Sequence, residues 1–346
     1  MLDAQEILPI DPPRLLGPSL GTSRFKSSLD DFVVEEILGF EPTGEGEHCL
    51  VWVEKVDRNT NDVAAEFAKK LGIRKRLVNH CGLKDRNGIT RQWFNLHLPG
   101  LPSPSAQDLD YEGVRVLKVT RNLRTLRRGC HQGNRFTIRL RDCTFTKEAA
   151  AVRWQMIIDR GVPNYFGPQR FGRDGGNIEQ AIRLMTGEIE VRDRALRGIL
   201  ISAARSLLFN AFVAKRIQLG AWNVPMEGEV FGFADNRSLV IPDNLRGDES
   251  DRVRNGTLEL TAPLWGTGEL LSQSQVRVFE EGVAKSFPDI VAGLAQFNLR
   301  QERRVIRLKP ESSELTWAGD NTLVLRFDLP TGTYATTLLR ELTELV

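Results

Sequence analysis

Apolar and polar residues alternate in the first part of the chain and again near its end. Residues 93–98 alternate in the way expected of a half-buried strand, and residues 323–327 do the same. Further β-rich stretches lie at 32–36, 48–53, 114–119 and 136–140. In the middle of the chain, apolar residues from 197 to 219 recur at helical spacing and stop before Gly220. This pattern predicts a long helix there.

The change of pattern predicts two domains, which a chain of 346 residues is long enough to form. Residues 161–176 are irregular and rich in glycine, and helices dominate until β-type alternation returns at about Ile306. We expect one domain built from residues 1–157 and 306–346, interrupted by an inserted domain of residues 158–305. The expected fold class is α+β: a mixed, mainly antiparallel sheet with helices, plus a helix-rich α/β insertion.

Composition narrows the class of protein. A hydrophobic content of 41% with 27% charged residues is typical of a soluble globular protein. No stretch comes near the ~18 apolar residues of a membrane span, and the first residues lack a signal-peptide pattern. We therefore expect a cytoplasmic protein without a membrane partner. No G-x-G-x-x-G follows a predicted strand and no Walker lysine motif occurs, so we expect no nucleotide cofactor.

The four cysteines are Cys49, Cys81, Cys130 and Cys143, and none forms a C-x-x-C pair. This spacing suits reduced thiols in a reducing compartment. Three of the cysteines are next to a histidine, which raises the question of a zinc site. Neighbouring residues in a strand point to opposite faces, however, so adjacent pairs make poor chelates. We expect no metal.

Positive charge is concentrated between residues 115 and 141, where nine basic residues occur without an Asp or Glu. A solvated surface usually mixes both signs, so this stretch is a candidate phosphate-binding face. The alternative is a basic surface without a ligand. The residues that we expect to contact phosphates are Arg121, Arg124, Arg127 and Arg128.

Asp85 is the most informative single residue. It lies between Lys84 and Arg86, whose charges favour its ionised form, and an ionised carboxylate can act as a nucleophile. Asn87-Gly88 follows directly and is a strong hairpin signal, because both residues tolerate positive φ. From spacing alone, the alternative is an ordinary aspartate that opens a tight turn.

The segment Gly82–Trp93 resembles the signature of the TruD family of tRNA pseudouridine synthases, which is close to G-x-K-D-[KR]-x-A-x-T-x-Q-W. The chain departs from it at Gly88, where the family commonly has alanine. Four more segments resemble family motifs, and the five follow in family order along nearly the whole chain. These four are 25–36, 133–138, 162–172 and 329–336.

The resemblance implies isomerisation of uridine to pseudouridine at position 13 of tRNA, on a pseudouridine synthase-like catalytic domain. The base is detached from its ribose, turned and rejoined through carbon, so the reaction needs no cofactor. Asp85 is the implied catalytic nucleophile on a uridine flipped out of its stack. It attacks the sugar or the ring, or removes a sugar proton; the sequence leaves these routes open. Lys26 is implied to pair with Asp85 and align it.

The resemblance also implies a base pocket of Phe32, Asn134, Phe136 and Tyr334. An amide can pair with the edge of uracil, and an aromatic ring offers a stacking surface worth ~1–3 kcal/mol per base. Each residue has a plainer alternative, such as a turn asparagine or a core phenylalanine. Tyr334 stands where the family usually has phenylalanine, and its hydroxyl needs a partner if it is buried.

The implied partner is tRNA, and no protein partner is implied. Two other functions remain. One is a non-catalytic RNA-binding or RNA-folding protein, and the other is an RNA glycosylase or nuclease with Asp85 as general base. The absence of a metal-binding carboxylate cluster counts against a nuclease, and the five ordered motifs count against both.

Overall fold

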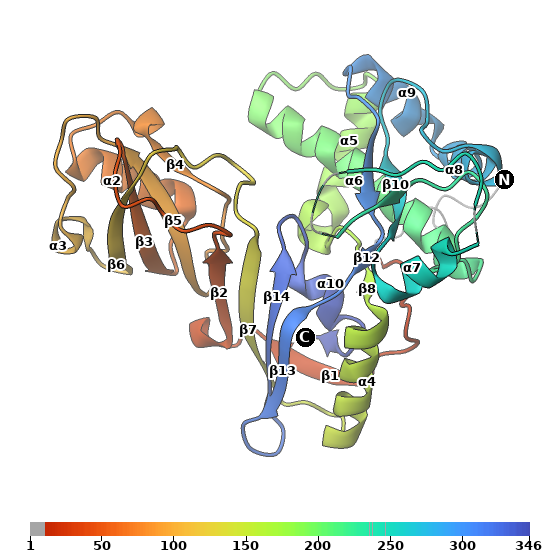
Figure 1. Ribbon diagram of the computed structural model, residues 1–346, viewed down its shortest axis with the longest axis horizontal. Coiled ribbons are helices and arrows are strands. Elements are labelled where there is room, and N and C mark those ends of the chain that lie inside the picture. Colours follow the sequence, from red (N-terminus) through yellow and green to blue (C-terminus); the bar gives the residue numbers. More distant parts are fainter. Residues whose placement is uncertain (1–10, 235, 237, 246) are drawn as a thin grey trace. The chain divides into compact units, whose positions relative to one another are not determined.

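The computed structural model describes residues 11–234, 236, 238–245 and 247–346, and these form two compact units (Figure 1). The first, which we call the sheet unit, comprises Ser19–Ile158, Pro310–Ala335 and Leu342–Val346. The second, the helical unit, comprises Asp159–Lys309, Thr336–Glu341 and the described residues up to Pro18.

From the sequence we assigned residues 11–18 and 336–341 to the domain built from 1–157 and 306–346. In the structure these residues pack with the helical unit. The backbone N–H groups of Leu15 and Leu16 donate to the buried carboxylate of Glu341 at 3.1 and 2.9 Å. A contact between residues more than 300 positions apart leaves no local pattern in the sequence. The first ten residues of the expected catalytic domain lie outside the described part.

The sheet unit is built on a ten-stranded sheet, whose main path runs β13-β14-β7-β2-β5-β3-β6 (Figure 1). Only the β2–β5 and β1–β15 pairings between its described strands are parallel. The expected α+β class with a mixed, mainly antiparallel sheet is confirmed. The strands are β1 (Thr22–Phe25), β2 (Phe32–Ile37), β3 (His48–Val56), β4 (Val78–His80), β5 (Ile89–His97), β6 (Val114–Asn122), β7 (Gly133–Arg141), β13 (Glu311–Trp317), β14 (Leu323–Pro330) and β15 (Glu344–Leu345).

The helices of this unit are α2 (Thr60–Lys70), α3 (Ala106–Leu109) and α4 (Lys147–Arg160), whose last two residues pass into the helical unit. Single 3₁₀ turns lie at Leu29–Asp31 and Lys75–Leu77. Helix α2 buries Val63 and Phe67, and the Phe67 ring meets the ring of Phe94 on β5 edge-on at 5.4 Å. This packing of α2 on the sheet also positions Thr60, the first residue of the helix, next to the loop that carries Asp85.

Aromatic side chains form a row in the core where β2, β7 and β14 lie side by side. The β7–β14 register places Phe136 opposite Phe327, with ring centroids 5.6 Å apart. Phe32 on β2 lies 6.1 Å from Phe136, and Trp154 of α4 lies 5.7 Å from Phe327. This row connects two of the expected base-pocket residues to the core of the unit.

The helical unit packs around its longest helix, α6. The helices are α5 (Gly176–Met185), α6 (Arg194–Gln218), α7 (Glu249–Asn255), α8 (Ser274–Ala284), α9 (Pro288–Gln296) and α10 (Ala335–Leu339), which begins at the last residue of the sheet unit's middle segment. The strands are β8 (Val162–Pro163), β9 (Phe231–Gly232), β10 (Glu259–Leu264), β11 (Glu302–Val305) and β12 (Arg307–Leu308), and 3₁₀ turns lie at Pro168–Arg170 and Arg173–Gly175.

Helix α6 has a mean hydropathy of 1.4 over an 18-residue window, 56% of which is buried. By length and composition it could cross a membrane, so the expectation that no stretch comes near a membrane span was too strict. The buried core helix of a soluble protein can have the same length and composition.

Three buried Arg–Glu pairs, at 2.7 to 2.8 Å, join the elements around α6: Arg216–Glu229, Arg303–Glu280 and Arg307–Glu259.

The aromatic row provides a test of the fold. Replacing Phe327 with alanine removes a fully buried ring that contacts both β7 and α4. We expect the free energy of unfolding to fall by about 3–5 kcal/mol in a denaturant titration. Val152→Ala, at a 64% exposed position of α4, is the matched control and should change it by less than about 0.5 kcal/mol. Similar losses in both variants would contradict this packing.

Candidate active site

The loop 81–88 joins the antiparallel strands β4 and β5 and carries Asp85 near its tip. The Asp85 side chain is 58% exposed. At the end of the loop, Gly88 has φ 150°, and a Cβ there would lie 2.5 Å from the backbone oxygen of Phe32. The positive φ and this close approach of β2 both favour glycine at position 88 of this chain.

A buried lysine holds the loop by hydrogen bonds to its backbone. Lys55 on β3 is fully buried, and its Nζ donates to the backbone oxygens of Asp85 at 2.6 Å and Arg58 at 2.7 Å. A longer contact of 3.4 Å reaches the oxygen of Lys84. Burial lowers the pKa of Lys55 to about 8, although the charge of Asp85 opposes this effect. The ammonium thus holds the backbone of the very residue that presents the carboxylate.

Two further buried side chains fix the same loop. Thr60 Oγ1 accepts a hydrogen bond from the backbone N–H of Lys84 at 3.1 Å and donates to Gln92 Oε1 at 2.8 Å. Gln92 Nε2 in turn donates to the backbone oxygen of Gly82 at 3.0 Å. Thr60 is 2% exposed and Gln92 is fully buried. Buried polar groups that satisfy one another in this way rigidify a segment.

The two cations next to Asp85 in sequence form ion pairs with other carboxylates. Lys84 Nζ pairs with buried Glu36 at 2.7 Å, and Arg86 Nε pairs with Asp57 at 2.9 Å. Lys84 and Arg86 therefore flank Asp85 in sequence, but their side chains bind Glu36 and Asp57 instead of its carboxylate.

Lys26 is the cation that the structure places at the Asp85 carboxylate, with Nζ 3.7 Å from Oδ1. The same Nζ lies 3.8 Å from the centroid of the Phe32 ring. Burial lowers the pKa of Lys26, and the charge of Asp85 opposes this effect. One ammonium thus contacts both the expected nucleophile and an expected base-pocket ring.

The expected base-pocket residues lie on neighbouring strands of the sheet unit. Phe32 and Phe136 are 4% and 7% exposed, so only their edges reach the surface. Asn134, at the start of β7, has a buried Oδ1 without a hydrogen-bond partner among the described residues. Tyr334 is half-buried in the turn that follows β14, and this turn is tied to the start of β7 by Thr331, which bonds the backbone oxygens of His131 and Gln132.

Beside the loop, Glu36, Cys81 and His131 bring potential metal-ligand atoms within 4.8 Å of one another. The Lys84 ammonium, 2.7 Å from the Glu36 carboxylate, already supplies a positive charge to this cluster. Burial and the same ammonium lower the pKa of His131 to about 4. The Lys84 ammonium therefore accounts for the positive charge that the Glu36 carboxylate needs. That the protein binds no metal stays a prediction.

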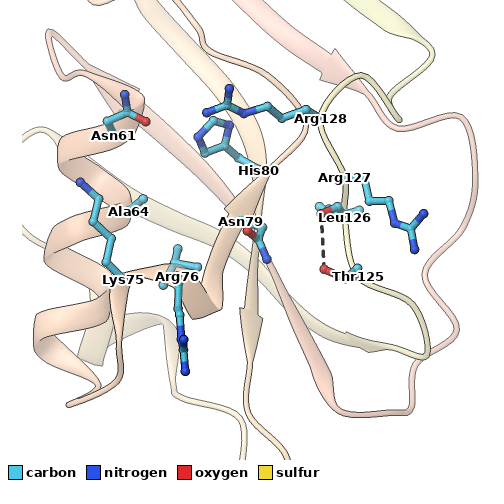
Figure 2. Close-up of a pocket in the computed structure, with 11 residues that line it drawn as sticks. Asn61, Ala64, Lys75, Arg76, Asn79, His80, Thr125, Leu126, Arg127 and Arg128 are labelled. Carbon is cyan, nitrogen blue, oxygen red and sulfur yellow. Dashed lines mark hydrogen bonds between the residues drawn. The ribbon is translucent and has the colours of Figure 1, made fainter. Parts of the chain in front are cut away.

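Basic residues line a cavity of about 630 Å³ between the start of α2 and the turn before β7 (Figure 2). Lys75 and Arg76 come from one side, and Arg127 and Arg128 from the other. Figure 2 shows Arg128 directed toward His80 and the start of α2, with Arg76 and Arg127 pointing away from them. Four cations around one hollow form a suitable surface for phosphate groups.

The other two predicted arginines are placed differently. Arg124 is exposed in the same turn but does not line the cavity. Arg121 directs its guanidinium toward the neighbouring loop, donating to the Ser103 hydroxyl at 2.8 Å and to the backbone oxygen of Leu101 at 2.6 Å. With its donors used in this way, Arg121 orders the neighbouring loop and is poorly placed for a phosphate.

Sequence reasoning missed the residues that support the loop and two of the four cations that line the cavity, Lys75 and Arg76. Lys55 shares the inward-facing positions of β3 with Val51 and Val53, and a lysine on an apolar face was the available signal. The run Arg74-Lys75-Arg76 was a second basic cluster, outside the stretch that the charge pattern singled out.

Lys55 makes the stability of the protein depend on pH. In the unfolded chain it keeps its proton up to about pH 10.5, whereas in the folded protein it loses the proton near pH 8. The unfolded state therefore binds more protons between these values, so the contribution of Lys55 to the free energy of unfolding rises as pH rises. The full rise corresponds to about 3 kcal/mol.

The measurement is the difference in unfolding free energy between wild type and Lys55→Met, taken from pH 7.5 to 10. All other titrating groups are shared by the two proteins, so the slope of the difference reports on Lys55. We expect the difference to grow with pH in favour of wild type. A difference independent of pH would show that the ammonium is not destabilised by burial.

Comparison with known proteins identifies the fold. A crystal structure described as a putative tRNA pseudouridine synthase D from Methanosarcina mazei superposes with a TM-score of 0.68, at 20% identity, over 96% of this chain and 94% of that one. The chain therefore has the fold of this protein, which is described as a pseudouridine synthase.

Sequence comparison identifies the family. The family model described as tRNA pseudouridine synthase D (TruD) matches residues 19–183 and 183–342. A tRNA pseudouridine synthase D from Colwellia psychrerythraea is 40% identical, over 96% of this chain and 93% of that protein. Another, from Pseudoalteromonas atlantica, is 42% identical over 93% and 92%. The chain belongs to the TruD family, and the resemblance seen in its motifs is confirmed.

Proposed function

We propose that this enzyme converts uridine to pseudouridine in tRNA, at position 13, with Asp85 as the catalytic carboxylate. Family membership and the names of the relatives support pseudouridine formation in tRNA. One observation carries the finer assignment: the exposed Asp85 carboxylate lies 3.7 Å from Lys26, whose ammonium also contacts Phe32. A reactive group, an orienting cation and an aromatic ring therefore meet at one place.

In the proposed reaction the target nucleotide leaves its stack, at a cost of a few kcal/mol, because a base inside a helix cannot reach a carboxylate on a loop tip. Asn134 Oδ1, buried and unpartnered among the described residues, accepts a hydrogen bond from the uracil N3–H. Phe32, Phe136 and Tyr334 contribute aromatic surface. An acceptor at this position favours a base edge that can donate at N3.

Asp85 then acts on the bound nucleoside by attacking the sugar or the ring, or by removing a sugar proton. In each route the bond from C1′ to N1 breaks and a bond from C1′ to C5 forms. The C5 hydrogen is lost to water and N1 takes up a proton, so the product is an isomer of the substrate. Lys26 orients the carboxylate, and the fixed backbone of residues 82–85 keeps it in place. Such positioning is a large part of enzymatic rate enhancement.

Release of tritium from C5 of uridine tests this proposal. Unmodified tRNA labelled at that position is incubated with wild type, with Asp85→Asn, and with the control Asp57→Asn, which removes a nearby carboxylate that pairs with Arg86. We expect wild type and the control to release tritium at similar rates. Asp85→Asn should be slower by about 10³-fold or more, because the reacting group itself is removed.

Two other outcomes would point to other functions. Binding of tRNA without any tritium release would favour a non-catalytic RNA-binding protein. Free uracil or cleaved RNA would favour a glycosylase or nuclease. Equal release by wild type and Asp85→Asn would remove Asp85 from the mechanism while leaving the synthase activity in place.

The basic cavity is the proposed phosphate-binding site. Affinity that comes from phosphate contacts falls with salt, with a slope that reflects the number of phosphates neutralised. Replacing Arg127 and Arg128 with alanine should therefore weaken tRNA binding and reduce the slope of log K against log salt by about 1 to 2. Lys69→Ala, an exposed lysine of α2 that does not line the cavity, is the control. An unchanged slope in the double variant would place the phosphates elsewhere.

A further inference from the structure

Two cysteines from distant parts of the sequence meet beside the candidate active site. The Sγ atoms of Cys81 and Cys130 lie 3.0 Å apart. The backbone holds the two segments together as well, because the N–H of Gly129 donates to the backbone oxygen of Cys81 at 2.7 Å. Cys81 is 1% exposed, whereas Cys130 is exposed.

The position of this thiol pair connects two functional parts of the sheet unit. Cys81 begins the loop that carries Lys84 and Asp85, and Cys130 ends the basic turn that carries Arg127 and Arg128. Cys49 and Cys143, the other two cysteines, have no cysteine partner. A covalent bond between Cys81 and Cys130 would therefore tie the catalytic loop to the phosphate-binding turn.

We propose that Cys81 and Cys130 are a reversible oxidation site, which forms a disulfide on exposure to a peroxide and thereby slows catalysis. The oxidation itself is independent of the enzyme's activity, but its effect on catalysis rests on the function proposed above. In a reducing compartment such a bond would be transient.

The reaction balances with hydrogen peroxide as oxidant. The sulfur of exposed Cys130 attacks one peroxide oxygen, the O–O bond breaks, and the thiol proton leaves with the departing oxygen as water. The sulfur of Cys81 then attacks the Cys130 sulfenic acid, the S–O bond breaks, and the Cys81 proton leaves with the hydroxyl as a second water. Two thiols lose two electrons and two protons, and one peroxide is reduced to two waters.

The environments of the two thiols suit this order of events. Burial and the nearby Glu36 carboxylate raise the pKa of Cys81, so its thiol is protected from direct oxidation. Cys130 is the thiol that a peroxide reaches first. Cys81, already in contact with it, competes with further oxidation of the sulfenic acid.

The disulfide would affect catalysis through geometry. A disulfide holds its sulfurs about 2.05 Å apart, so the pair must close by about 1 Å. The movement would act on the first residue of the loop that presents Asp85. A displacement of about 1 Å at a catalytic group can cost on the order of 10²-fold in rate.

The test treats full-length wild type, Cys130→Ser and the control Cys143→Ser with hydrogen peroxide and reads the product by peptide mapping without reduction. Wild type and Cys143→Ser should lose two free thiols and yield one cross-linked peptide pair containing Cys81 and Cys130. Cys130→Ser should yield no such pair. Absence of this pair in wild type, a link between chains, or over-oxidised Cys130 without a link would overturn the proposal.

Single-turnover rates on tRNA supply the second readout. Oxidised wild type should be at least about tenfold slower, and dithiothreitol should restore the rate, whereas the rate of Cys130→Ser should not respond to peroxide. A cross-linked protein with an unchanged rate would overturn the effect on catalysis. If reduced wild type shows no synthase activity, the proposed function fails, and the peptide map still decides whether the oxidation site exists.

Discussion

The candidate site depends on one buried interaction, the contact between the Lys55 ammonium and the backbone oxygens of Asp85 and Arg58. Removing an ammonium from water is costly, and the low pKa of Lys55 records that cost. The hydrogen bonds to carbonyl oxygens offset part of it. The result is a loop whose backbone is anchored in the sheet although its tip lies in solvent.

This anchoring allows an exposed carboxylate to have a defined position. Thr60 and Gln92 hold the residues before Asp85, and the close approach of Phe32 to Gly88 fixes the residue where the loop ends. Lys84, adjacent to Asp85 in sequence, is directed away into a buried pair with Glu36. Lys26 then remains as the cation at the carboxylate. The Asp85 carboxylate is thus left exposed on a backbone that other side chains hold.

Much of the fold followed from local patterns, because alternation and helical spacing report burial directly. The strand β14 and the long helix α6 are examples. The tight hairpin expected at Asn87-Gly88 is instead the end of the longer loop 81–88, and of these two residues Gly88 has a positive φ. What the sequence could not give were contacts between distant residues. Lys84 and Arg86 were assigned to Asp85 because they are adjacent to it, but Glu36 and Asp57 bind them in the structure. Arg121 was grouped with the other arginines, although its guanidinium is used by the loop at Leu101 and Ser103. The motif resemblance supplied Lys26, Phe32 and Asn134, which no periodicity would have singled out.

The central claim is that a rigid, buried support makes Asp85 effective. Thr60→Val tests it most directly, because it keeps the shape of the side chain and removes the hydrogen bonds to Lys84 and Gln92. Losing them costs about 1–3 kcal/mol, which corresponds to roughly 5- to 150-fold in rate if the support acts in the transition state. We predict a single-turnover rate on tRNA at least about fivefold lower, with tRNA affinity within about twofold of wild type. An unchanged rate, or a rate and an affinity that fall together, would contradict the account.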